Sequence, residues 1–257
     1  MDPDVVCGSC GISLAHPSRC GACQTVSYCS LECQRAHWKL HKKTCKASAA
    51  AKFVKFLTAA RAGDTVAQYN LGICYQSGTG IVKDDKEAVR WFQVAAEAGH
   101  VDSQSNLGAC YYTGVGVKQN FTKASRWFRV AAETGNAGAQ HNLGLMYYKG
   151  TGVAQDFTEA VRWLRPGAEA GNAFAQFNLG LCYIHGKGVL KDFTEAARWF
   201  RTAAEGGDAD AQFSLGLSYE LGNGVKKDCS EAVRWYRAAA DQGNEDAASA
   251  LSRLSTL

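Results

Sequence analysis

The sequence lacks any long hydrophobic run: no stretch approaches the roughly 18 to 20 consecutive apolar residues that a helix needs to span a bilayer. It has only three prolines in 257 residues, and its net charge is only +4. This composition argues against a disordered or collagen-like chain, and so small a charge does not indicate a nucleic-acid or membrane partner. The first residues also lack the charged-then-apolar layout of a signal peptide. We therefore expect a cytoplasmic or nuclear protein.

The cysteines divide the chain into two parts. Seven of the eleven lie in the first 45 residues, and the other four are scattered over the remainder. In a reducing compartment, thiols are more often metal ligands or small buried side chains than disulfides. The cysteine-rich segment is therefore interpreted as a metal-binding module, separate from the rest of the chain.

Beyond that segment the sequence repeats with a period of 36 residues and no gaps. Each copy has a glutamine, Leu-Gly three residues later, a tyrosine, a Gly-x-Gly turn and Arg-Trp. The five copies open at Gln68, Gln104, Gln140, Gln176 and Gln212. A fixed period of this length indicates a solenoid, in which one small unit stacks on the next.

Each copy predicts two helices. Ala67, Leu71 and Tyr75 lie on one apolar face of the first helix, which the Gly-x-Gly element ends. In four copies the second helix starts at Asp-x-x-Glu, as in Asp192 and Glu195, a pair that we expect to form a reciprocal capping box. The second copy has Asn120 and Lys123 instead, which keeps the cap and loses the reciprocal acid. Five repeats at 68–247, a degenerate capping helix at 49–67 and a C-terminal capping helix at 248–257 make about twelve helices.

This pattern resembles the Sel1-like repeat, a relative of the tetratricopeptide repeat, from about Ala49 to the C-terminus. The resemblance implies an all-α protein, a right-handed α/α superhelical solenoid whose first helices line a concave face. It also implies a scaffold or adaptor that binds protein partners.

Positions that vary between copies on the first helix are candidates for binding. The position of Tyr69 is taken by Ser105, His141, Phe177 and Phe213 in the other copies, and that of Gln76 by Tyr112, Tyr148, Ile184 and Glu220. The candidate groove residues are Tyr69, Tyr112, Tyr148, Phe177 and Phe213. Such aromatics suit a peptide or a partner helix, but packing between neighbouring repeats explains them equally well.

The first 45 residues contain four pairs with metal-ligand spacing. These are Cys7 with Cys10, Cys20 with Cys23, Cys29 with Cys33, and His41 with Cys45. Eight ligands suit two tetrahedral Zn²⁺ ions in closed, structural sites, and zinc must stabilise a segment too short to fold by apolar burial alone. Spacing leaves open three ways of dividing the four pairs between the two ions. Cys33, His37, His41 and Cys45 are each four residues apart, so His37 fits the helical spacing as well as His41 does.

Tyr28-Cys29, Cys33-Gln34 and Trp38-x2-His41-x3-Cys45 resemble a MYND zinc finger, which covers residues 7–45. The resemblance implies interleaved sites and leaves His37 as a surface or supporting residue. One ion is then held by Cys7, Cys10, Cys29 and Cys33, and the other by Cys20, Cys23, His41 and Cys45. MYND fingers bind short, often proline-rich peptides, and Gln34 and Trp38 match positions that line the peptide groove in several members. The alternative for Trp38 is packing within the small core of the finger.

Two other classes of function are less well supported. Some MYND proteins are SET-domain methyltransferases, but repeats occupy the rest of this chain, so we do not expect an enzyme. A transcriptional or chromatin regulator acting near nucleic acid is the alternative. Residues 1–46 carry six basic and three acidic side chains. Seven thiolates and two Zn²⁺ ions then leave the segment about neutral, which removes most attraction to phosphate. The sequence therefore predicts a zinc-binding adaptor for protein–protein interactions.

Overall fold

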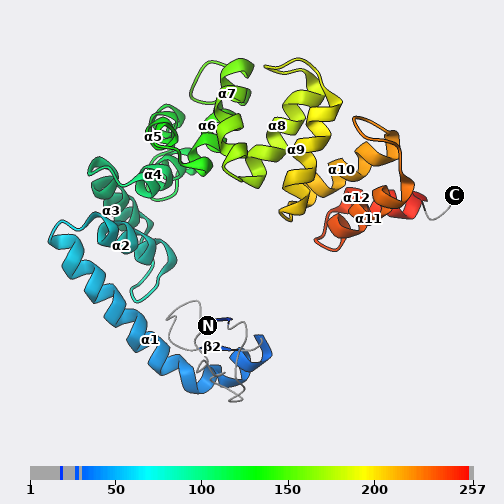
Figure 1. The fold of residues 1–257 in the computed structure, drawn as a ribbon. Helices are drawn as coiled ribbons and strands as arrows, with labels where there is room; N and C mark the ends of the chain where they lie inside the picture. The colour runs from blue at the N-terminus through cyan, green and yellow to red at the C-terminus, as the bar shows by residue number, and fades with distance from the viewer. Residues whose placement is uncertain (1–17, 20–26, 29–30, 255–257) are drawn as a thin grey trace. The chain divides into compact units, whose positions relative to one another are not determined.

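The computed structural model describes residues 18–19, 27–28 and 31–254, with side chains for Cys33, 35–37 and 48–254. Within these ranges it contains twelve helices and two strands of two residues each, which confirms the predicted helical fold (Figure 1). The chain forms two compact units, Met1–Ser103 with Gly114–Lys118, and Gln104–Thr113 with Gln119–Leu257. In the described part of the chain, no helix has the length and apolar character needed to cross a membrane.

The helix α1 (Leu31–Arg61) starts inside the cysteine-rich segment and continues into the first repeat layer. It contains neither glycine nor proline, so no residue in it favours a stop. Near its C-terminus, Phe53 and Ala60 are buried together with residues of α2 (Thr65–Ser77). The segment 49–61, expected as part of a capping helix of its own, is thus the last part of this longer helix.

Five pairs of helices come next, and each pair is one repeat. The first helices are α2, α4 (Val101–Thr113), α6 (Ala137–Lys149), α8 (Ala173–His185) and α10 (Ala209–Leu221). The second helices are α3 (Asp85–Glu97), α5 (Phe121–Glu133), α7 (Phe157–Glu169), α9 (Phe193–Glu205) and α11 (Cys229–Ala240). A last helix, α12 (Glu245–Leu254), packs on α11.

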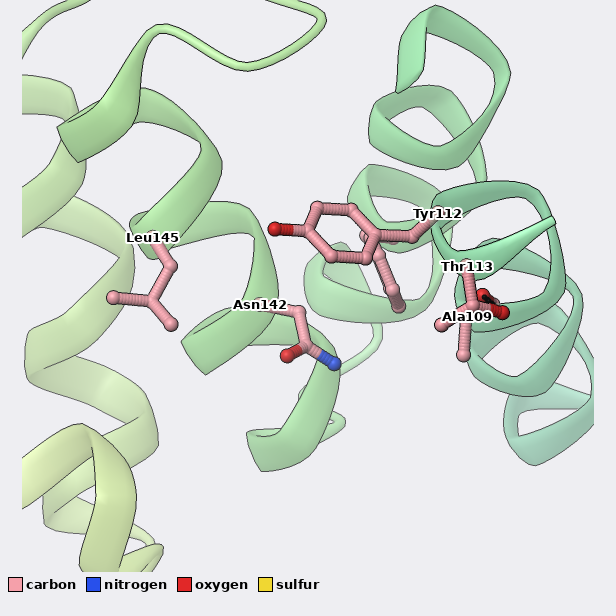
Figure 2. Close-up of a pocket in the computed structure, with 6 residues that line it drawn as sticks. Ala109, Tyr112, Thr113, Asn142 and Leu145 are labelled. Atoms are coloured by element: carbon pink, nitrogen blue, oxygen red, sulfur yellow. Dashed lines mark hydrogen bonds between the residues drawn. The ribbon is translucent and has the colours of Figure 1, made fainter. Parts of the chain in front are cut away.

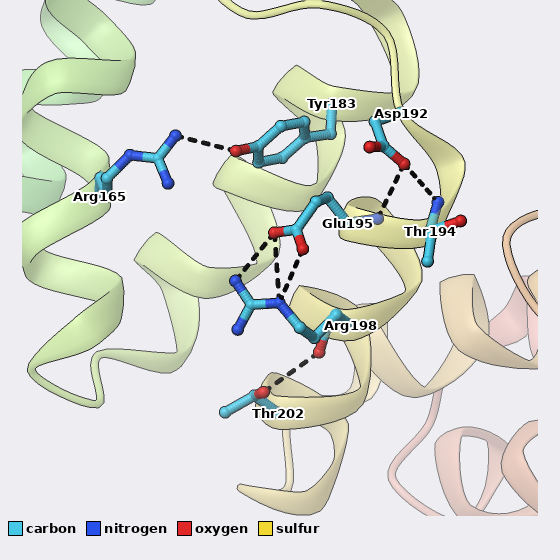
Figure 3. Close-up of polar contacts among 7 residues, drawn as sticks. All are labelled: Arg165, Tyr183, Asp192, Thr194, Glu195, Arg198 and Thr202. Carbon is cyan, nitrogen blue, oxygen red and sulfur yellow. Dashed lines mark hydrogen bonds and ion pairs between the residues drawn. The ribbon is translucent and has the colours of Figure 1, made fainter.

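The four second helices that start at Asp-x-x-Glu differ from the expected capping box. Asp192 caps α9 as predicted, because its side chain accepts the N–H groups of Thr194 and Glu195 at 2.8 and 3.1 Å (Figure 3). The Glu195 side chain does not return to the cap and instead pairs with Arg198 at 2.9 Å. The N–H of Asp192 donates to the carbonyl of Tyr183 in the preceding helix, so the cap also ties the two helices together.

Two glycines of each repeat allow neighbouring parts of the chain to pack closely, one between the two helices of a repeat and one between successive repeats. A Cβ on Gly180 in α8 would lie 2.5 Å from the Phe200 ring of α9, so only glycine permits this helix spacing. Gly188, the second glycine of the Gly-x-Gly turn, has φ +73°. A Cβ there would lie 2.0 Å from the carbonyl oxygen of Phe157 in the preceding repeat. The turn is therefore a contact between repeats as well as a helix stop.

Side chains at fixed positions of the pattern also join neighbouring repeats, a glutamine that all five copies have and an arginine that the second to fifth copies have. The buried Gln176 side chain donates to the carbonyl of Ala168 in the preceding repeat at 3.0 Å. The Arg165 guanidinium donates to the Tyr183 hydroxyl of the following repeat at 2.8 Å (Figure 3). Equivalent bonds recur in other repeats, for example Gln212 to Ala204 at 3.1 Å. The constant residues of the pattern thus form the scaffold, as their recurrence predicted.

The fifth repeat has a polar contact built on a residue type that the other copies do not have. Tyr236 takes the place of a phenylalanine or leucine and is fully buried. Its hydroxyl donates to Glu220 at 2.7 Å, and Arg253 of α12 pairs with the same carboxylate at 2.7 Å. Burial and the neighbouring carboxylate raise the pKa of Tyr236, so the phenol keeps its proton.

Candidate functional site

The strands of the cysteine-rich segment bracket two of the predicted ligands. β1 (Ser18–Arg19) pairs antiparallel with β2 (Ser27–Tyr28), Ser18 lying opposite Tyr28. Cys20 and Cys23 belong to the segment that this pairing closes, and Cys29 directly follows β2. In the described part of this segment, a pair of short strands thus precedes the start of a helix.

Three of the predicted ligands belong to α1. Cys33 lies in its first turn and is half-buried, while His41 and Cys45 follow at four-residue spacing. His37 is also half-buried, so it is not the fully exposed residue that a surface position implies. Helical spacing places positions 34, 38, 41 and 45 on one face of α1. The two peptide-binding candidates thus share a face with the ligands assigned to the second ion.

Most of the predicted zinc site lies outside the described residues. This applies to Cys7, Cys10, Cys20, Cys23 and Cys29, and to the side chains of Gln34, Trp38, His41 and Cys45. Among the side chains that are described, no group of three His, Cys, Asp or Glu residues is placed to hold a metal. The ligand set and its division between two ions therefore stay predictions.

The helical cysteines of the repeats are buried, as their exchange with methionine and serine indicated. Cys74, Cys110 and Cys182 are 6%, 4% and 0% exposed. Burial raises the pKa of Cys74, and it raises the pKa of Cys182 to about 11. A buried thiol that keeps its proton is a poor nucleophile and a poor metal ligand, so these residues fill space in the core.

The five candidate groove aromatics are half-buried, and each packs against a ring of the second helix in its own repeat. The ring-centroid distances are 6.1 Å for Tyr69–Phe92, 5.3 Å for Tyr112–Phe121, 5.2 Å for Tyr148–Phe157, 5.8 Å for Phe177–Phe200 and 5.6 Å for Phe213–Tyr236. These rings therefore have a packing role inside each repeat, and their remaining area faces solvent.

The structure adds exposed apolar residues that sequence reasoning missed. On α8, Phe174 is 62% exposed, and on α10, Leu217 and Leu221 are 38% and 57% exposed. Phe174 lies near His141 of α6, with ring centroids 5.9 Å apart. The sequence could have indicated Phe174 as a candidate, because the other copies have valine, aspartate or glycine at this position. The first helices of the fourth and fifth repeats thus expose apolar side chains that folding alone does not require.

A family model described as the Sel1 repeat matches residues 65–100, 101–136, 137–172, 173–208 and 209–244. The solved structure of a Sel1 repeat protein from Oxalobacter formigenes is 33% identical, with a TM-score of 0.75 over 83% of this chain and 84% of that one. A protective antigen of uropathogenic Escherichia coli with an SLR fold is 32% identical, with a TM-score of 0.73 over 87% of this chain and 51% of that one.

The cysteine-rich segment matches a second family model, the MYND finger, at residues 7–45. SET domain-containing protein 14 of Caenorhabditis elegans is 56% identical over 41 residues, 16% of this chain and 10% of that protein. SET domain and MYND-type zinc finger protein 6 of Schizosaccharomyces pombe is 44% identical over 46 residues, 18% of this chain and 10% of that protein. The chain spans only about a tenth of these relatives, and their similarity lies in short stretches of the finger region.

The matches agree with the predicted order of a zinc-binding finger followed by five repeats. A Sel1-repeat solenoid is typically a non-catalytic scaffold, and both modules are protein-interaction modules.

Proposed function

Since this chain belongs to the Sel1 repeat family and carries a MYND finger ahead of its repeats, we propose that it is a zinc-dependent adaptor. The finger binds a short, proline-rich peptide, and the repeats dock a partner protein. The observation that carries this proposal is the presence of two interaction modules in one chain. A ligand set dominated by thiols suits a reducing compartment, so the proposal includes a location in the cytoplasm or nucleus.

In this proposal the finger holds two Zn²⁺ ions. Cys7, Cys10, Cys29 and Cys33 bind the first, and Cys20, Cys23, His41 and Cys45 bind the second. Bound zinc supplies cross-links that stabilise a segment too short to fold by apolar burial alone. The position of Cys33 in the first turn of α1, directly after β2 and Cys29, supports this set.

The peptide-binding face is assigned to Gln34 and Trp38 on α1. An indole packs well on proline rings, and an amide pairs with the exposed N–H and C=O groups of an extended peptide. Four-residue spacing places both positions on one face of the helix. Because His41 and Cys45 share that face, zinc binding and peptide binding are expected to depend on the same stretch of α1.

Replacing Trp38 with alanine is expected to weaken peptide binding by at least about tenfold, since aromatic anchors dominate such interfaces. The measurement is fluorescence anisotropy of labelled proline-rich peptides, each compared with a proline-free scramble, on the full zinc-loaded chain. Gln34→Ala is expected to weaken binding less, because a single uncharged hydrogen bond contributes about 0.5–1.5 kcal/mol.

The matched control is Arg35→Ala, which changes an exposed side chain of the same helix turn. It is expected to bind as the wild type does. If Trp38→Ala retains its zinc and binds the peptides with unchanged affinity, Trp38 packs within the finger and the assigned face is wrong.

A further inference from the structure

The second repeat has a pocket on its first helix. We propose that it receives a single aromatic side chain of a partner peptide, an inference that rests on the proposed docking role of the repeats. The pocket has a volume of about 230 Å³ and lies between α4, α5 and α6 (Figure 2). It is lined by Ala109, Tyr112 and Thr113 of α4, Phe128 of α5, and Asn142 and Leu145 of α6.

Two positions of α4 carry a smaller residue in this copy than in every other copy: Ala109, which lines the pocket, and Ser105, one turn before it. Ser105 stands where the other copies have Tyr69, His141, Phe177 and Phe213. Ala109 stands where the other copies have Ile73, Leu145, Leu181 and Leu217. The two positions are four residues apart on α4 and therefore lie on one face of the helix. One ring and one branched aliphatic side chain are thus missing from the same face of α4, and the second of them is missing from the pocket lining.

The other repeats show what fills this place when the chain supplies it. The ring of Phe177 lies 5.8 Å from that of Phe200, and the ring of Phe213 lies 5.6 Å from that of Tyr236. Phe128 occupies the equivalent position in the second repeat, but Ser105 has no ring to lie over it. Phe128 instead forms part of the pocket lining. The contact that this repeat lacks is therefore the one that three other repeats make internally, an aromatic ring against an aromatic ring.

The size and the lining of the pocket agree with this occupant. An apolar cavity of about 150 Å³ is enough to bind benzene, so about 230 Å³ accommodates a phenyl ring with its first methylene. Ala109, Leu145 and Phe128 supply apolar surface. Figure 2 shows Tyr112 extending from α4 toward the helix that carries Asn142. These two residues place a hydroxyl and an amide beside the pocket, suited to the backbone of the segment that delivers the ring.

The test uses N-acetyl-L-phenylalaninamide as the probe and the full zinc-loaded chain labelled with ¹³C in its alanine and leucine methyl groups. We expect saturable shifts of the Ala109 and Leu145 methyl signals, with a dissociation constant on the order of millimolar for a ligand of this size. N-acetyl-L-alaninamide, which has no ring, is expected to cause no saturable shift at the same concentrations.

Ala109→Leu restores the residue type of the other repeats and should fill the pocket. It is expected to abolish the Leu145 shift while the melting temperature stays equal or rises. Ser105→Phe is the second variant, which supplies the missing ring from the chain itself, and it is expected to have the same effect. Ala154→Leu is the matched control, because Ala154 is exposed and the next repeat already carries Leu190 at that position. It should bind the probe as the wild type does.

Equal shifts with both amides, or probe binding that survives in a folded Ala109→Leu or Ser105→Phe protein, would overturn the pocket assignment. That failure would leave the adaptor proposal intact, because a partner can dock on other surfaces of the repeats. Conversely, if the finger binds no peptide, the probe titration is unaffected, since it reads the second repeat alone.

Discussion

Removal of zinc with a chelator is expected to unfold residues 7–45 while the helices of residues 65–244 stay folded. Structural zinc contributes about 10–16 kcal/mol of binding free energy in small finger peptides, and a segment this short has no comparable apolar core. The repeats have their own core of alanine, leucine and phenylalanine side chains and need no metal. Limited proteolysis read by mass spectrometry, with and without chelator, measures which part loses protection.

Elemental analysis is expected to give two Zn²⁺ ions per chain, and Cys33→Ser is expected to lower this number to about one. Cys229→Ser is the matched control, because Cys229 is an exposed thiol at the start of α11, far along the sequence from the finger. It should leave the zinc content unchanged. Far fewer than two ions in the wild type, or a finger that stays protected after chelation, would contradict the proposed di-zinc module.

Gly188→Ala is expected to lower the free energy of unfolding by about 3–5 kcal/mol. Two penalties coincide at this residue. Its positive φ of +73° is costly for any residue with a Cβ, and that Cβ would lie 2.0 Å from a backbone oxygen of the preceding repeat. A backbone oxygen cannot rotate away as a side chain can, so the junction between two repeats must open. Urea unfolding followed by circular dichroism measures the loss.

Gly171→Ala separates these two penalties. Gly171 also has a positive φ, +88°, but a Cβ there would have no heavy atom within 4 Å. This control should therefore lose only the conformational part, about 1–2 kcal/mol. Equal losses in the two variants would show that the contact across the repeat junction contributes nothing.

The repeat architecture was predictable because the same constraints act five times in one chain. Gln176 and Gly188 recur at a fixed spacing, and each makes a contact with the preceding repeat that no other residue type makes as well. Comparison of the copies therefore separates required residues from variable ones. The helices could be predicted from apolar spacing and from caps such as Asp192, which depend only on neighbouring residues.

The polar partners were harder to predict, because alternatives close in sequence compete for the same group. Glu195 has two candidates, the N–H of its own cap and the guanidinium of Arg198, and the pattern contains both. The structure selects the arginine, since the carbonyl of Tyr183 already accepts the cap N–H. That carbonyl belongs to the preceding helix, so the outcome depends on the helix pair and not on the local motif.

The pocket could not be predicted from the sequence either, because it also depends on contacts between helices. The sequence shows that Ser105 is smaller than the residues at this position in the other copies. One small residue does not predict a pocket, because neighbouring side chains can fill the space. The pocket needs Ala109 on the next turn and Leu145 on the neighbouring repeat, and their proximity is a property of the stacked helices. In the finger, spacing alone left the division of the ligands open, because several divisions satisfy the same intervals.

The carboxylate of Glu220 makes the last junction chemically different from the others. Insertion of an extra repeat between the fifth repeat and α12 would strip this carboxylate of the guanidinium of Arg253, while the phenol of Tyr236 would stay beside it. Duplication or loss of one of the first four repeats does not change the contacts among Glu220, Tyr236 and Arg253. Length variants of the array are therefore expected to arise upstream of the fifth copy, with that copy and α12 inherited together as one unit.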